Sequence, residues 1–96
     1  MRTIREDEEV RRAVDDACER WPRADDAWNT ITWALARDPT VGPPLTEGGR
    51  ARSLTFQGAK SIGMPTVTVL YTFDRSFVDI HRANFVEPQA MQAGHA

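Results

Sequence analysis

Two stretches in the first half of the chain have the apolar spacing of amphipathic helices. Between about residues 7 and 20 the apolar positions recur every three or four residues, at Val10, Ala13, Val14, Ala17, Cys18 and Trp21. From about 24 to 36 a second stripe is formed by Ala24, Ala27, Trp28, Ile31, Ala34 and Leu35. Pro22 ends the first helix and Asp38-Pro39 ends the second. The pattern therefore predicts two antiparallel helices joined by a tight corner.

The residues before the first helix fit a helix start. Thr3-Ile4-Arg5-Glu6 has the spacing of a capping box, and the acids that follow suit the positive end of a helix dipole. A short first strand within residues 1 to 4 is the alternative. The single cysteine, Cys18, falls among apolar partners at helical spacing, so we expect it in the core as a small hydrophobic residue.

In the second half of the chain the apolar period changes from that of a helix to that of a strand. "RARSLTF" (50–56) alternates briefly, and "TVTVLYTF" (66–73) places Val67, Val69, Tyr71 and Phe73 on one side. After a turn at residues 74–76 the alternation resumes at Val78 and Ile80. Glycine- and proline-containing loops at 40–49 and 57–65 separate these strands.

Helices that precede strands indicate an α+β fold. We expect an N-terminal helical hairpin packed on one face of a three- to four-stranded antiparallel sheet. Residues 1–88 are predicted to form this single domain, and 89–96 a small, polar tail.

Composition narrows the function classes. Twelve basic residues stand against fourteen acidic ones, for a net charge of −2, which argues against sequence-blind binding of duplex nucleic acid. Eleven of the twelve bases are arginine, so a local site for phosphate or carboxylate stays open. No CxxC or HxxxH spacing exists, and we predict neither a metal nor a cofactor. Without an apolar spanning run or a signal peptide, we expect a cytoplasmic protein that has no membrane partner.

Two segments resemble the RelE/ParE superfamily of small bacterial toxins. "ARDPTVGPPL" (36–45) is similar to the end of the family's second helix, where Asn-Pro or Asp-Pro is followed by Gly and Leu. "TVTVLYTFDRSFVDI" (66–80) resembles its penultimate and last strands. The resemblance covers about residues 5–86. It implies a RelE-like toxin that an antitoxin protein holds inactive, and that either cleaves messenger RNA on the ribosome or binds a target protein such as gyrase.

One position departs from the family pattern. The family's penultimate strand typically reads Arg-hydrophobic-hydrophobic-Tyr, and its arginine falls on Thr68 of this chain. The phosphate-binding cation expected there is therefore absent. Tyr71 matches the tyrosine, but its alternation with Val67 and Val69 favours a place in the core.

Three candidate catalytic residues follow from the chemistry of RNA cleavage, which needs proton transfer and cations that stabilise the phosphorane charge. His81 is the plausible acid–base group. Asp79 lies two residues away on the same side of a strand and could orient it, and Arg82 could supply the charge.

Three further basic residues are candidates for substrate binding. Arg50 and Arg52 share the alternation of Leu54 and Phe56, so a regular strand would turn them toward the core side or its edge. Lys60, in the loop "QGAKSIGMP", could close over the open sheet face.

Two interpretations without catalysis also fit the sequence. A non-enzymatic member of the same fold would act by binding a protein, and then the missing arginine has no cost. Alternatively, the chain is a catalytically silent binding or dimerising module, in which Thr66, Thr68, Leu70, Thr72 and Phe77 form a weakly polar open face for a ligand or a homodimer.

Overall fold

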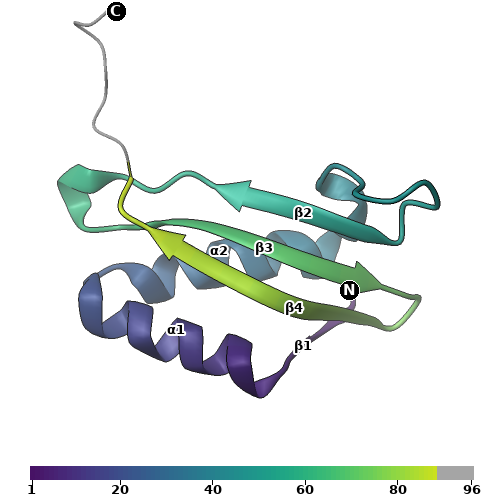
Figure 1. Cartoon of the computed structure of the whole chain (residues 1–96), viewed down its shortest axis with the longest axis horizontal. Coiled ribbons are helices and arrows are strands. Elements are labelled where there is room, and N and C mark those ends of the chain that lie inside the picture. The colour runs from purple at the N-terminus through teal and green to yellow at the C-terminus, as the bar shows by residue number, and fades with distance from the viewer. Residues whose placement is uncertain (89–96) are drawn as a thin grey trace, which may run out of the picture.

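The computed structural model describes residues 1–88, so the predicted tail at 89–96 lies outside the described residues. Within this range the elements follow one another as β1 (Thr3–Glu6), α1 (Glu8–Arg20), α2 (Ala24–Arg37), β2 (Ala51–Phe56), β3 (Thr66–Phe73) and β4 (Phe77–Val86). Short 3-10 turns occupy Pro39–Val41 and Lys60–Ile62. Both helices lie on the same side of the sheet (Figure 1), which confirms the predicted α+β architecture with an N-terminal helical hairpin.

The sheet has the strand order β1-β4-β3-β2. β2, β3 and β4 are antiparallel neighbours, whereas β1 pairs in parallel with β4. The sheet is therefore mixed rather than purely antiparallel. The capping-box interpretation of residues 3–6 is wrong because these residues form β1, and Asp7 caps α1 instead by accepting a hydrogen bond from the backbone N–H of Val10 at 2.9 Å.

The core lies between the helices and one face of the sheet. Its buried side chains are Val10 and Val14 from α1, Ala27, Trp28, Ile31 and Leu35 from α2, and Val67, Val69, Tyr71, Val78 and Ile80 from the strands. Cys18, expected among them, is exposed. The reason is angular, because Ala17 takes the inward position on that turn of α1 and the next residue points about 100° away.

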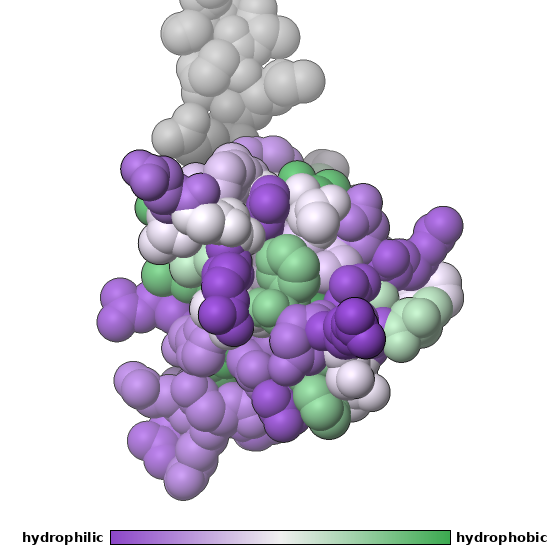
Figure 2. All heavy atoms as spheres, turned by 90° about the vertical axis from the view of Figure 1, so that its right-hand side faces the viewer, coloured by the Kyte–Doolittle hydropathy of each residue, from purple (hydrophilic) through white to green (hydrophobic). Residues whose placement is uncertain are grey.

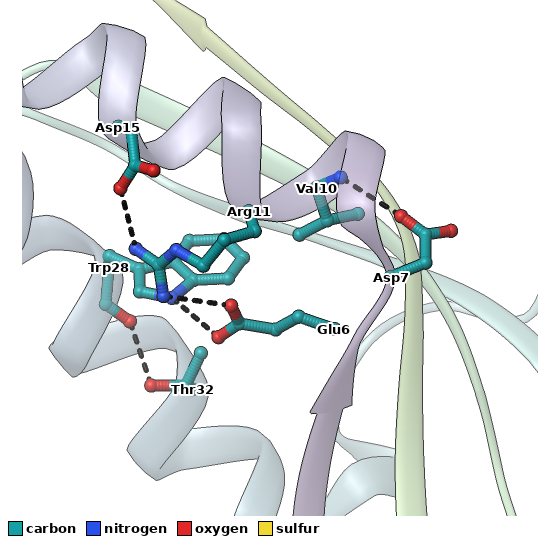
Figure 3. Close-up of polar contacts among 7 residues, drawn as sticks. All are labelled: Glu6, Asp7, Val10, Arg11, Asp15, Trp28 and Thr32. Atoms are coloured by element: carbon teal, nitrogen blue, oxygen red, sulfur yellow. Dashed lines mark hydrogen bonds and ion pairs between the residues drawn. The ribbon is translucent and has the colours of Figure 1, made fainter.

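Glu6 ties β1 to both helices (Figure 3). One carboxylate oxygen accepts a hydrogen bond from Nε1 of Trp28 on α2 at 3.0 Å, and the other accepts from Nη1 of Arg11 on α1 at 3.0 Å. Arg11 in turn pairs with Asp15 at 3.3 Å. The indole N–H of a buried aromatic residue is thereby satisfied, and the short first strand is held against the hairpin.

Tyr71 is buried, as its alternation predicted, and its hydroxyl fastens the chain that leaves α2. The hydroxyl donates to the backbone oxygen of Pro39 at 2.6 Å and accepts from the N–H of Gly42 at 3.2 Å. Glycine is required at this close approach, because a Cβ at position 42 would lie 2.1 Å from the backbone oxygen of Ser53.

A β-bulge interrupts β4 at His81. Leu70 pairs with Arg82 and Tyr71 pairs with Ile80, which leaves His81 as an extra residue without a partner on β3. The apolar positions explain the shift, since Val78 and Ile80 face the core before the bulge while Ala83 and Phe85 pack against it afterwards. A regular strand could not turn both pairs inward, because the spacing from 80 to 83 breaks the period of two.

Deleting His81 should therefore leave the fold intact. The deletion aligns Ile80 and Arg82 as consecutive residues of a regular strand, and every other β3–β4 pair keeps its partner. We expect cooperative urea unfolding, with a free energy of unfolding within about 2 kcal/mol of the parent. Deletion of Leu70 is the matched control, since it turns part of β3 onto the wrong face and should abolish cooperative unfolding. Equal damage from both deletions would contradict the bulge.

Candidate functional site

The sheet surface opposite the helices carries a hydroxyl-rich set of side chains, which we name the open face. It is formed by Ala51, Ser53 and Thr55 of β2, Thr66, Thr68, Leu70 and Thr72 of β3, and Phe77, Asp79, Arg82, Asn84 and Val86 of β4. Thr68, which stands where the family has arginine, shares a 2.9 Å hydrogen bond with Thr55 across the β2–β3 pair. This part of the open face is thus polar and uncharged.

The bulge brings His81 and Arg82 to the same face. Nε2 of His81 lies 2.8 Å from the hydroxyl oxygen of Thr72, which belongs to the open face, and Arg82 pairs with Leu70, which also belongs to it. Both side chains are exposed. Strict alternation would have placed these neighbours on opposite faces. The structure therefore places these two candidate residues together, directly after the part of β4 that pairs with β1.

Asp79 has a different partner from the one that the sequence suggested. Its two carboxylate oxygens accept hydrogen bonds from Nε and Nη2 of Arg5, at 2.6 and 3.0 Å. This bidentate pair, more than any other influence, holds the pKa of Asp79 below its usual value. His81 instead shares its hydrogen bond with Thr72, and among the described residues no hydrogen bond joins it to Asp79.

Arg5 lies in the candidate site, although sequence reasoning did not single it out. Its guanidinium carbon lies 3.8 Å from the ring centroid of Phe77, in addition to the bond with Asp79. β1 brings it there, since Arg5 pairs with Asp79 and Thr3 pairs with Phe77. The sequence did not indicate this contact because Arg5 and Asp79 are 74 positions apart and because residues 3–6 also fit a helix start.

Arg52 faces the core side, as the alternation with Leu54 predicted, and it organises a loop. Its guanidinium donates to the backbone oxygens of Gly49 at 2.9 Å, Gly42 at 2.8 Å and Thr40 at 3.2 Å. Arg50 is exposed in the loop just before β2. The structure therefore does not bring Arg52 to the open face beside His81 and Arg82.

Lys60 is exposed. The turn that carries it packs against the segment between α1 and α2 and does not lie over the open face. The backbone oxygen of Gly63 accepts a hydrogen bond from the N–H of Arg23 at 3.0 Å. Gly63 also packs so closely on Pro22 that a Cβ there would lie 2.6 Å from Cγ of that proline. The expectation that Lys60 closes over the open face is wrong, because the turn that carries it packs at the junction of α1 and α2. Gly58, at the start of the loop, instead donates to the hydroxyl of Thr66 at 2.9 Å.

The end of the molecule at the β3–β4 turn is largely hydrophilic. Figure 2 views it directly and shows mostly purple and white side chains, with several small green patches that are set apart from one another. Two arginines, Arg2 and Arg52, lie over the ring of Phe73, each 5.8 Å from its centroid. An apolar area this limited does not mark a hydrophobic docking surface.

The assembled open face offers limited chemistry. His81 is a proton carrier with a hydroxyl neighbour, and Arg82 is a cation beside it. Within residues 1–88, no carboxylate lies at ion-pair distance from Arg82, and no cluster of three or more His, Cys, Asp or Glu side chains could hold a metal ion.

Comparison of the chain with protein-family models finds no match, and comparison with curated proteins finds none either. In the part of the chain that the structure describes, neither helix combines the length and hydropathy that crossing a membrane requires.

The ion pair at Asp79 should make stability depend on pH. A carboxyl whose pKa is lowered by folding stabilises the protein above its unfolded pKa of about 4, and this contribution disappears as pH falls toward the folded value. Asp79→Asn should therefore lower the urea midpoint at pH 7, and the difference from the parent should shrink as pH falls below about 4. Glu47→Gln, in an exposed loop, is the charge-matched control and should change little at either pH. A deficit for Asp79→Asn that persists at low pH would contradict this account.

Proposed function

We propose that this protein inhibits bacterial growth, as the toxins that its sequence resembles do, and that it acts by binding a target protein on the open face rather than by cleaving RNA. A cognate antitoxin would silence it by covering the same face. The proposal rests on the sequence resemblance. It is supported by the position of the helical hairpin on one side of the sheet, since within residues 1–88 no helix or strand covers the other side.

Binding is favoured over cleavage because most of the candidate cations already interact with other groups of the protein. Arg5 is neutralised by Asp79, and Arg52 is turned toward backbone oxygens on the core side. Thr68 takes the place of the family's arginine and bonds to Thr55. Arg82 thus remains as the open-face cation without an acidic partner among the described residues. Stabilising a phosphorane usually takes more positive charge than one exposed guanidinium, whereas one such cation is a normal feature of a protein interface.

Induced expression in a bacterium tests the proposal. Growth should stop while cellular transcripts stay intact, as measured by primer extension across abundant messages. Arg82→Glu should relieve the arrest, because it places a negative charge where the target is bound. Arg75→Glu, in the exposed β3–β4 turn, changes the net charge equally and should remain inhibitory.

His81→Ala separates binding from cleavage. Removing one contact from an interface should weaken inhibition less than about tenfold, while removing a proton carrier costs about a hundredfold or more in cleavage rate. Folded, abundant protein that leaves growth unchanged would refute the proposed function. Site-specific transcript cleavage that is lost in His81→Ala would refute the binding mechanism.

A further inference from the structure

The half of β4 beyond the bulge has a free edge. β1 pairs with β4 only along Phe77–Ile80, and the chain then turns into α1 at Asp7. On its other side, β4 pairs with β3 as far as Val86. Among the described residues no strand covers the outer edge of residues 82–86, and a strand edge of this kind presents unpaired backbone N–H and C=O groups.

A groove runs between this edge and α1, which lies beside β4 in Figure 1. It consists of two hollows of about 530 and 200 Å³, which have Ala13, Ala83 and Asn84 in common. Glu9 lies at one end of the groove, and Asp16 and Arg20 lie toward the other. Asn84 and Ala13 therefore mark its middle.

We propose that the free edge of β4 binds the same edge of a second copy of this chain, in an antiparallel two-fold pairing centred on Asn84. Directly opposed residues of antiparallel strands lie on the same face. Arg82, Asn84 and Val86 belong to the open face, and Ala83 and Phe85 to the core face. A centre at Asn84 therefore pairs Arg82 with Val86 of the second copy and the small Ala83 with its large Phe85.

Charge complementarity favours a second copy over an unrelated extended peptide. The same two-fold operation runs the two α1 helices antiparallel, so that Glu9 of one copy meets Arg20 of the other at both ends of the groove. Both side chains are exposed, and neither takes part in an ion pair within residues 1–88. Ala13 at the middle leaves room for the helices to approach. This interface joins two four-stranded sheets into one continuous sheet with a doubled open face.

Cysteine cross-linking tests the two-fold position in the full-length chain with Cys18→Ser. A residue on the axis faces its own copy at a Cα separation of about 4.5–5.5 Å, which a disulfide can span. Asn84→Cys should therefore form a disulfide-linked dimer under mild oxidation. Arg82→Cys is the matched control, because its two copies would be about 13 Å apart and should stay unlinked.

Sedimentation equilibrium tests the charges without a cysteine. The parent chain should form dimers in a concentration-dependent way. Glu9→Arg or Arg20→Glu alone should raise the dimer dissociation constant by about threefold to tenfold, and the double variant should restore the parent value. A chain that stays monomeric up to near-millimolar concentration overturns the proposal. So does equal cross-linking at positions 82 and 84, or a double variant no better than the singles.

Discussion

The register shift at His81 is the constraint on which the arrangement of this protein depends. Val78 and Ile80 must face the helices, and Ala83 and Phe85 must face them too. A strand without an extra residue could satisfy only one of these pairs. It would turn either Arg82 and Asn84 or Asp79 and His81 toward the core in exchange. One unpaired residue in β4 costs less than either alternative. The bulge is therefore a consequence of core packing before it is a feature of any site.

Two features of the surface meet at this residue. His81 and Arg82 reach one face although they are neighbours in the chain, and the outer edge of β4 becomes free at the same place because β1 ends opposite Ile80. The exposed pair His81 and Arg82 therefore lies where the free edge of β4 starts. In the two proposals Arg82 and Asn84 belong to both surfaces, so a bound target and a second copy of the chain would meet at these residues.

Local patterns predicted the parts of the fold that are local in origin. The helices, their corner, the strand at 66–73, the buried Tyr71 and the inward direction of Arg52 all follow from apolar spacing and from proline positions. β1 could be offered only as an alternative, within residues 1 to 4, because four residues of mixed polarity become a strand only by pairing with Phe77–Ile80, more than 70 positions away. Its misassignment as a helix cap also concealed Arg5, which engages Asp79 and changes the charge of the candidate site.

The remaining differences have similar causes. The direction of the loop around Lys60 is set by Pro22 and Arg23, which lie far from it in the sequence. The bulge was visible in principle, since the apolar positions 78, 80, 83 and 85 change phase after 80. The phase change indicates a bulge only if residues 83 and 85 pack in the same core as residues 78 and 80, which the sequence does not show. Sequence periodicity alone would have ended the strand at the same place.

Cross-strand nuclear Overhauser effects between backbone protons of β3 and β4 test the central claim most directly. The account predicts contacts that pair Leu70 with Arg82 and Tyr71 with Ile80, with no direct partner for His81 on β3. An unbroken register, in which Leu70 is paired with His81 and Val69 with Arg82, so that Arg82 is turned to the core face, would contradict it.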